Sequence, residues 1–495
     1  MDRRRFFKTA AAGTLPLAAA TLTSSPAAAA SAPPRGNRVL IRGAYLVTLD
    51  PKLGELRGDV LIESGRIAAI GQDLKAGGAE VVDARDMIAI PGFIDSHRHT
   101  WQSAVRHIGS DWTFLQYLTT SFTKFGIHFR PQDVYAGNLL GRLAALESGI
   151  TTLLDWSHIM NTPEHADAAI QALRDSGGRS VFAMGWPQTP EPFKWIQRST
   201  LDFPDDIRRV RKQYFASNTG LVTMQMAARG PSFGVMETVR RDLGIARDLG
   251  LKVTIHEGGG EGIVAMHEAK LTGPDITYVH LQSAGDDALK IIKDTGGTVS
   301  ISPLNEEWKT PWRGSNAATY RLLRQGILPS LSVDTETVVP GDMFSSMRGT
   351  LQSARHGVSN DPAQPAPANP RDWNPAAVVS TRRILEMATL GGAAPCGLEG
   401  EVGSLSPGKA ADIVLLRASH LNYFPINDGI GAVVVAADTG SVEAVFVAGK
   451  AVKYNGRLVN TALVARARRA ALESRDYLFA RAGIPVPDGL QSRRS

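Results

Sequence analysis

Five polar residues follow short apolar runs of the sequence, and their types are those that bind a metal ion. His97 and His99 follow the run AIPGFID, and His256, His280 and Asp334 end three later runs. Imidazole nitrogen and carboxylate oxygen suit a cation such as zinc, and the alternate residues His97 and His99 can both reach one ion where a strand ends. The pattern therefore indicates a metal site.

A simpler interpretation has to be weighed against the metal site. A single histidine at a strand end is usually packed or hydrogen-bonded in the core. Four of the eleven histidines together with an aspartate, all at predicted strand ends, are hard to explain in that way. The other histidines fall on predicted helices or loops, where ordinary roles are expected, with His107 and His158 as the candidates for exceptions.

The elements that would position these residues alternate between short apolar strands and longer helical stretches. Eight strands are predicted, namely AIPGFID, ITTLLD, SVFAMGW, LVTMQMA, LKVTIH, DITYVH, TVSISP and ILPSLSVD. Eight βα units predict a TIM barrel, whose active site lies at the carboxyl ends of its strands. The five polar residues fall at those ends.

Two further β-rich segments flank the predicted barrel. Short β runs and turns over residues 38–90 recur in the same style over residues 403–460. We expect them to fold together as one small, discontinuous β-sandwich domain. The barrel would then occupy residues 91–402, and residues 461–495 would form a C-terminal helical tail.

The first thirty residues have the layout of a cleaved signal peptide. Arg3, Arg4 and Arg5 precede an Ala/Leu-rich stretch that ends in small residues, which resembles a twin-arginine signal. Pro16 and Pro26 break that stretch, which is short for a membrane span of about 20 residues, so no anchor is expected after cleavage. The sequence predicts a signal peptide over residues 1–30, export by the twin-arginine machinery, and a periplasmic or secreted location.

Charge and cysteine content exclude some classes of partner. The net charge is +6, and about half of it lies in the leader. No Lys/Arg run elsewhere resembles a phosphate-binding stripe, so nucleic acid is not an expected partner. Cys396 is the only cysteine, which excludes an intramolecular disulfide and a Cys-rich metal site.

Three motifs resemble those of a known family. PGFIDSHRHT resembles the first-strand signature of the amidohydrolase superfamily, SVDTETVVPGDMFSSMR resembles the eighth-strand segment of its cytosine deaminase and chlorohydrolase branch, and LSPGKAADIVLL resembles its C-terminal sandwich strand. The resemblance implies one divalent ion, zinc or alternatively iron, because no lysine ends the fourth strand to bridge two ions. It implies His97, His99, His256 and Asp334 as ligands, with His280 beside the metal. It also suggests a homodimer or larger assembly.

Such a site implies hydrolysis of a small molecule. The ion would lower the pKa of a bound water toward about 7 and polarise the group under attack. Asp334 would take the proton and return it to the leaving nitrogen, while His280 would stabilise the developing negative charge or orient the hydroxide. The predicted function is therefore cleavage of a non-peptide carbon–nitrogen bond in a cyclic or heteroaromatic substrate, by an aminohydrolase (deaminase) or an amidase.

One departure from the family pattern keeps other reactions open. Deaminases of this branch carry a glutamate three residues after the strand-five histidine, and here that position is Gly259. Glu257 and Glu261 are the alternative proton shuttles. Dehalogenation or decarboxylation on the same metal site, or a catalytically silent binding protein, are the other hypotheses.

The substrate-binding wall can be sought among polar and aromatic residues near the predicted strand ends. Aromatic side chains there would suit a flat or apolar substrate. The candidates are Trp101, Gln102, Trp156, Asn305 and Glu306.

Overall fold

The structure is a computed structural model, and it describes residues 32–309, 317–359, 369–372 and 374–486. The predicted signal peptide over residues 1–30 lies outside the described residues.

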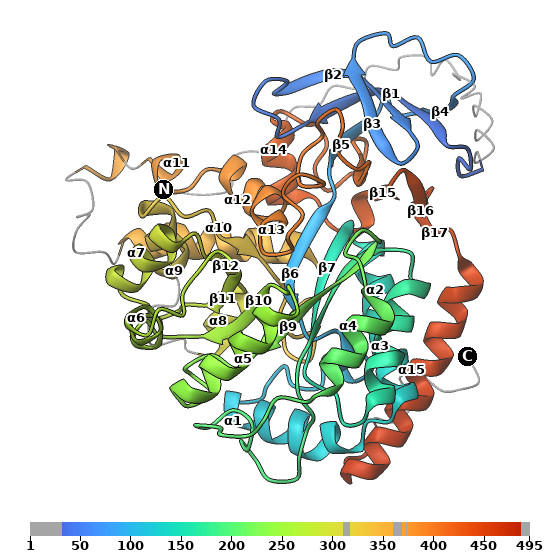
Figure 1. The fold of residues 1–495 in the computed structure, drawn as a ribbon. Helices are drawn as coiled ribbons and strands as arrows, with labels where there is room; N and C mark the ends of the chain where they lie inside the picture. Colours follow the sequence, from blue (N-terminus) through green and yellow to red (C-terminus); the bar gives the residue numbers. More distant parts are fainter. Residues whose placement is uncertain (1–31, 310–316, 360–368, 373, 487–495) are drawn as a thin grey trace, which may run out of the picture. The chain divides into compact units, whose positions relative to one another are not determined.

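The predicted barrel is confirmed. Within the described residues, eight parallel strands follow one another around a sheet in sequence order (Figure 1). They are β6 (Phe93–Arg98), β7 (Ile150–Ser157), β8 (Arg179–Met184), β9 (Val222–Ala228), β10 (Val253–Glu257), β11 (Ile276–His280), β12 (Thr298–Ile301) and β13 (Ser330–Leu331). The last strand meets the first just past its end, where the Asp334 amide donates to the His97 carbonyl at 2.9 Å and the His99 amide donates to the Asp334 carbonyl at 2.8 Å.

Helices follow most of the barrel strands. The main helices of the described barrel region are α2 (Pro131–Glu147), α3 (Pro163–Asp175), α4 (Asp206–Tyr214), α5 (Met236–Asp248), α6 (Glu261–Glu268), α7 (Asp286–Thr295), α8 (Pro303–Lys309), α9 (Ala317–Arg324), α10 (Met343–Ser359) and α12 (Thr381–Met387). Local sequence sets their ends. Pro163 occupies the first turn of α3, and α7 stops at Gly296, whose φ of 76° is a left-handed conformation that glycine adopts without strain.

An additional helical segment lies between β6 and α2. It runs through η1 (Thr100–Val105), α1 (Phe114–Tyr117) and η2 (Leu118–Phe125). The sequence analysis does not predict it, and it supplies part of the candidate site described below.

The strand-rich domain joins the two ends of the described chain. Its sheet has the order β17-β16-β15-β14-β5-β1-β2-β3, with β4 beside β1. Its strands are β1 (Arg38–Val47), β2 (Glu55–Glu63), β3 (Arg66–Gly71), β4 (Glu80–Asp83), β5 (Met87–Pro91), β14 (Ile413–Arg417), β15 (Val442–Val447), β16 (Lys450–Tyr454) and β17 (Arg457–Leu458). β5 pairs antiparallel with β14, which is the junction expected between segments 38–90 and 403–460. The exact domain boundaries remain predictions.

Two apolar cores correspond to these two parts. The barrel strands and their helices share a large buried cluster, while Val39, Ile41, Ile413 and Phe446 belong to a separate cluster within the strand-rich domain. The C-terminal helix α15 (Thr461–Ala482) packs on α2, and together they bury a third, small apolar cluster. The helical tail therefore contributes to the barrel's outer packing.

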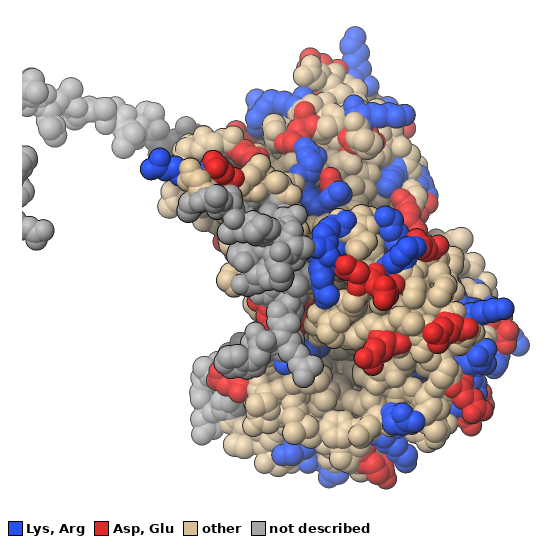
Figure 2. Space-filling view, turned by 90° about the vertical axis from the view of Figure 1, so that its left-hand side faces the viewer, with Lys and Arg blue, Asp and Glu red and all other residues tan. Residues whose placement is uncertain are grey.

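The surface carries both signs of charge. On the face shown in Figure 2, Lys and Arg side chains are interspersed with Asp and Glu side chains. Among the described helices, none combines the length and the apolar character that crossing a membrane requires.

Candidate metal centre and active site

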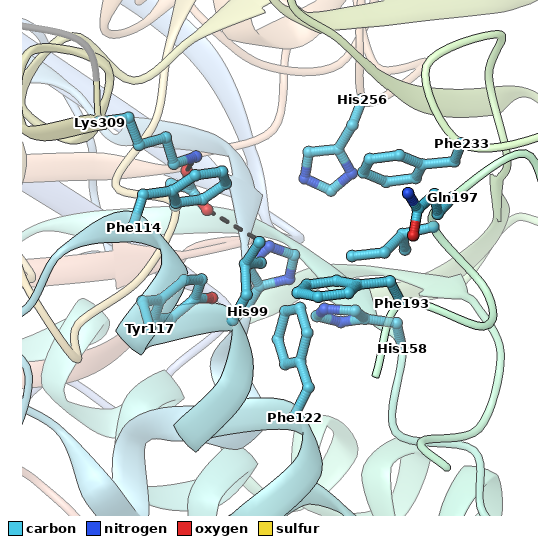
Figure 3. Close-up of a pocket in the computed structure, with 13 residues that line it drawn as sticks. His99, Phe114, Tyr117, Phe122, His158, Phe193, Gln197, Phe233, His256 and Lys309 are labelled. Carbon is cyan, nitrogen blue, oxygen red and sulfur yellow. Dashed lines mark hydrogen bonds and ion pairs between the residues drawn. The ribbon is translucent and has the colours of Figure 1, made fainter. Parts of the chain in front are cut away.

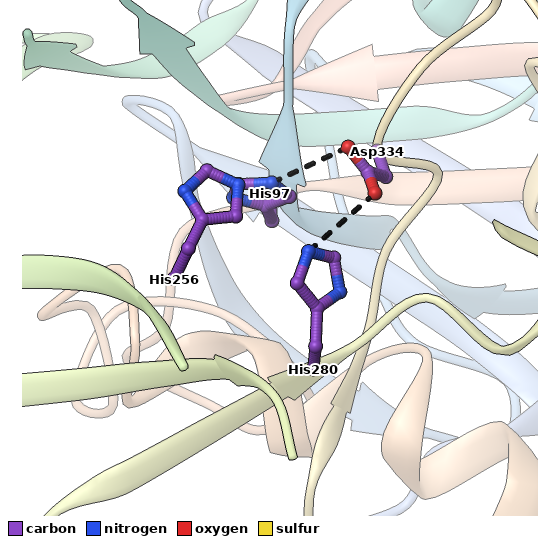
Figure 4. A group of neighbouring side chains, drawn as sticks. All are labelled: His97, His256, His280 and Asp334. Atoms are coloured by element: carbon purple, nitrogen blue, oxygen red, sulfur yellow. Dashed lines mark ion pairs between the residues drawn. The ribbon is translucent and has the colours of Figure 1, made fainter. Parts of the chain in front are cut away.

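Four of the five predicted metal-site residues offer ligand atoms to a single point. His97 comes from β6, His256 from β10, His280 from the end of β11, and Asp334 from the segment after β13. One nitrogen or oxygen atom from each lies within 4.8 Å of the others (Figure 4). The barrel brings these distant residues together because parallel strands end on the same side of the sheet.

His99 lies beside this group. Its Nε2 is 3.3 Å from Asp334 Oδ1, and Nε2 of His97 is 3.5 Å from the same oxygen. The Nδ1 atom of His99 is 2.9 Å from the Trp156 carbonyl oxygen, which directs the other ring nitrogen toward Asp334. A backbone partner of this kind fixes the orientation of a metal-binding histidine. All five predicted residues therefore meet at one place.

The donor atoms fit a divalent cation. Both ring nitrogens of His97 and Nδ1 of His256 are buried without a hydrogen-bond partner among the described residues. Buried polar atoms are nearly always paired, so unpaired imidazole nitrogens facing a carboxylate indicate a missing electropositive partner. Three histidines and an aspartate are also a donor set that zinc accepts.

The protonation states favour metal binding. Burial lowers the pKa of His99 to about 3, and burial lowers the pKa of His256 and His280 well below the ordinary value. Burial by itself would raise the pKa of Asp334, but the Lys309 ammonium and the neighbouring His97 ring outweigh it and hold that pKa well below its usual range. The site thus offers neutral imidazoles and an ionised carboxylate at neutral pH, which are the forms that ligate a metal.

The backbone is strained at two of these residues. His280 has a φ of 88° and Asp334 a φ of 69°, both in the left-handed region that side chains other than glycine seldom adopt. Strain of this kind costs about 1–3 kcal/mol and persists where the surrounding structure imposes it. Here the pairing between β6 and the segment after β13 holds Asp334 in place.

Lys309 is a site residue that the sequence analysis missed. Its Nζ donates to Asp334 Oδ2 at 2.9 Å and lies 3.4 Å from His280 Nε2. It lies eight residues beyond the end of β12, at the last turn of α8. Only a helix folded back over the strand ends brings it to the site, and no local pattern marks that arrangement.

Glu306, a predicted substrate-binding residue, contacts His280 instead of the cavity. Its Oε1 lies 3.3 Å from His280 Nδ1 and accepts a hydrogen bond from the Ser302 amide at 2.8 Å. Burial raises the pKa of this carboxyl group to about 8. Glu306 therefore orients the His280 ring from behind.

A cavity of about 380 Å³ opens beside the cluster (Figure 3). Its lining combines residues of the metal site with apolar and aromatic side chains from the surrounding loops. The lining residues are His99, Phe114, Tyr117, Leu118, Phe122, His158, Phe193, Ile196, Gln197, Phe233, His256, Lys309 and Asp334. An apolar cavity with convergent polar groups at one end is typical of a small-molecule site.

Most of the aromatic lining was not foreseen. Phe114, Tyr117, Leu118 and Phe122 occupy positions i, i+3, i+4 and i+8, which is the spacing of one helix face. That periodicity is the signal that could have identified them. Phe193 and Phe233 lie in loops, where no periodic signal exists.

The predicted substrate-binding residues lie behind this lining. Trp101 donates to His158 Nδ1 at 3.3 Å, Gln102 donates to the Tyr117 hydroxyl at 3.0 Å, and Trp156 packs against His256 with ring centroids 4.3 Å apart. Asn305 is also buried, and none of these four residues lines the cavity. Their direct contact with substrate remains a prediction.

The two candidate proton shuttles also lie outside the lining. Glu257 follows His256 on β10, and its carboxylate accepts hydrogen bonds from the Ser232 hydroxyl at 2.9 Å and from the Gly259 amide at 3.2 Å. Glu261 is exposed in the first turn of α6. Their role in proton transfer remains a prediction.

Comparison with known proteins identifies the family. A family model described as "Amidohydrolase family" matches residues 88–452, a span that includes all five metal-site residues. The chain belongs to the amidohydrolase family. The expected superfamily is thereby confirmed.

Relatives of this amidohydrolase include nucleoside deaminases. The 5'-deoxyadenosine deaminase of Methanosarcina mazei is 25% identical over 453 residues, which cover 88% of this chain and 98% of that protein. The 5-methylthioadenosine/S-adenosylhomocysteine deaminase of Symbiobacterium thermophilum is 27% identical, covering 84% and 93% respectively.

Solved structures share the fold. A zinc-bound adenosine deaminase of Xanthomonas campestris has a TM-score of 0.71 at 21% identity and covers 90% of this chain and 100% of that one. A zinc complex of atrazine chlorohydrolase from Arthrobacter aurescens has a TM-score of 0.70 at 22% identity and covers 88% and 100%. The amidohydrolase is a metal-dependent enzyme that hydrolyses carbon–nitrogen bonds other than peptide bonds in small heteroaromatic or cyclic molecules.

Proposed function

We propose that this amidohydrolase is a zinc-dependent aminohydrolase, which replaces an exocyclic amino group of a heteroaromatic ring with oxygen from water and releases ammonia. The observation that carries the proposal is the cluster of His97, His256, His280 and Asp334 beside an aromatic cavity that His256 and Asp334 help to line. Flat rings fit such a cavity, and the deaminase names of the relatives agree with this reaction.

A single ion is proposed, held by His97, His99, His256 and Asp334. When bound, the ion activates water and polarises the ring carbon under attack. Asp334 then accepts the proton of the attacking water and passes it to the leaving nitrogen. Lys309 holds the Asp334 carboxylate in position, because its ammonium donates to Oδ2 at 2.9 Å.

His280, whose Nε2 lies 3.7 Å from Asp334 Oδ2, would stabilise the charge that develops on the ring. Glu306 fixes its orientation by bonding to the opposite ring nitrogen. A preorganised group of this kind stabilises the transition state without moving during the reaction.

The test is ammonia release from aminated heteroaromatic compounds by zinc-loaded protein. Asp334→Asn should reduce kcat by at least about 10²-fold, with the zinc content measured for each protein. Asp294→Asn changes an exposed carboxylate on α7 and serves as the control, with unchanged activity expected. The proposal is contradicted if no aminated compound releases ammonia, or if the enzyme releases chloride from chlorinated rings but no ammonia from aminated ones.

We also propose that the enzyme is exported by the twin-arginine pathway and acts in the periplasm or outside the cell. The paired arginines of the leader support this location. Replacing Arg4 and Arg5 with lysine should keep the protein in the cytoplasmic fraction. The homodimer or larger assembly suggested by family resemblance can be tested by light scattering on the same preparations.

A further inference from the structure

Beside the metal-binding cluster, the cavity is walled by apolar side chains from three separate segments. The first segment is α1 with η2, the second is the loop after β8, and the third is the loop after β9. They contribute, in that order, Phe114, Tyr117, Leu118 and Phe122, then Phe193 and Ile196, then Phe233. Because a helical segment and two separate loops converge on one apolar surface, no single element forms this wall.

The aromatic rings of the wall are held in place by contacts with one another and with the site histidines. The rings of Tyr117 and Phe122 have centroids 5.5 Å apart, and those of Phe122 and His158 are 5.0 Å apart. Phe233 lies beside His256 with centroids 5.4 Å apart. Since the rings are already ordered, an apolar ligand binds there at little cost in side-chain entropy.

Phe193 adopts a strained backbone conformation at this wall. Its φ is 65°, in the left-handed region, which is an outlier for a bulky side chain. Its carbonyl oxygen accepts hydrogen bonds from the amides of Ile196 and Gln197, at 3.0 Å and 2.9 Å, and these close the turn. Strain at such a residue is maintained by its surroundings and is typical of ligand-binding segments. Figure 3 shows the Phe193 ring within the cavity wall.

Polar partners for a substrate substituent are scarce among the described lining residues. The Tyr117 hydroxyl is buried and already bonded to Gln102, and the Lys309 ammonium is bonded to Asp334. Asp334 is the only carboxylate in the described lining, and Gln197 provides the one side-chain amide. Apart from Gln197 and the His158 ring, the described lining outside the metal site offers a hydroxyl group little replacement for its bonds to water, so burying one against the phenylalanine rings is unfavourable.

We infer that the substrate carries a large, uncharged apolar substituent, aromatic by preference, where the substrates of a nucleoside deaminase carry a sugar. This inference rests on the proposed function, in which the reacting amino group of the substrate lies at the end of the cavity next to the metal site. The wall of Phe122, Phe193 and Phe233 would receive the substituent. The amidohydrolase would then differ in specificity from the relatives that deaminate nucleosides.

The test compares ligands that share one ring and differ in the substituent. Zinc-loaded protein is titrated calorimetrically with 9-benzylpurine and with purine riboside, and kcat/KM is measured for the corresponding 6-amino compounds. The benzyl compounds should bind at least about 10-fold more tightly and react with a correspondingly higher kcat/KM, because apolar pockets discriminate by about 10–200-fold.

The outcomes separate the two proposals. Tighter binding of the riboside, or binding of neither ligand, overturns the inference. Tighter binding of 9-benzylpurine without ammonia release from any amine refutes the proposed function and leaves the apolar subsite standing.

Variants of the wall provide a second measurement. Phe193→Ala and Phe233→Ala should each weaken binding of 9-benzylpurine by about 10-fold or more while changing riboside binding by less than about 3-fold. Phe424→Ala removes a ring that is 63% exposed and does not line the cavity, so it should change neither affinity. Equal losses for both ligands in the wall variants would show a general structural role and overturn the inference.

Discussion

Breaking the buried ion pair between Arg229 and Asp242 should destabilise the barrel strongly. Arg229 directly follows β9, Asp242 lies in α5, and both side chains are fully buried. Two parallel hydrogen bonds of 2.8 Å join them. Burial raises the pKa of Asp242 even though Arg229 opposes that shift, which shows how costly desolvation is here. Asp242→Asn keeps the side-chain volume but leaves a buried guanidinium without its counterion.

The expected loss is about 3–5 kcal/mol, the usual cost of removing one partner of a buried pair. Unfolding entropy is about 2.1 cal/mol/K per residue, so a chain of this size loses about 1 °C of Tm for each kcal/mol. Differential scanning calorimetry should therefore show a fall of about 3–5 °C.

An exposed ion pair with the same distance between its charged atoms is the matched control. Arg38 and Glu63 are also 2.8 Å apart, but both side chains are more than 40% exposed. Glu63→Gln should cost less than about 1 kcal/mol. Replacing both members of the buried pair, with Arg229→Met and Asp242→Leu, should recover most of the stability. Equal shifts for Asp242→Asn and Glu63→Gln would refute the reasoning.

Three further perturbations test other parts of the structure. Gly137→Ala in α2 should destabilise the protein by about 1–3 kcal/mol, because the added Cβ would lie 2.2 Å from the Trp101 carbonyl oxygen. Gly244→Ala in α5 adds a Cβ with no neighbouring atom within 4 Å and should stabilise the protein by about 0.5–1 kcal/mol. Chemical denaturation measures both changes and their signs. Burial lowers the pKa of His165 below its ordinary value of 6.5, so below that pH the unfolded chain binds a proton at His165 that the folded protein does not. The free energy of unfolding should therefore fall as the pH drops through 6.5, by up to about 1.4 kcal/mol per pH unit. Unfolding curves at pH 7.5 and 5.5 should show a smaller pH dependence for His165→Asn. Bound zinc should add about 4 kcal/mol to the free energy of unfolding when the free metal is 1,000 times its Kd, so a chelator should lower Tm and restored zinc should raise it again. An unchanged Tm with loss of bound zinc counts against the metal site.

The sequence by itself determined the residues that form the centre of the site. His97, His256, His280 and Asp334 could be found because a strand is a local pattern, and a parallel barrel brings all strand ends to one side. The same argument predicted the eight strands and the sheet built from both ends of the described chain. Family resemblance then supplied the chemistry that the residue types alone left open.

Only the tertiary structure decided what surrounds that centre. Lys309, Phe193 and Phe233 reach the cavity from a helix and two loops whose paths depend on packing across the barrel. The structure also placed Trp101 and Glu306 behind the lining, although both lie near the end of a strand in the sequence. Loop conformation and side-chain direction depend on contacts between segments far apart in the chain, so no local spacing encodes them. For that reason the metal site could be predicted from the sequence, and the shape and polarity of the substrate pocket could not.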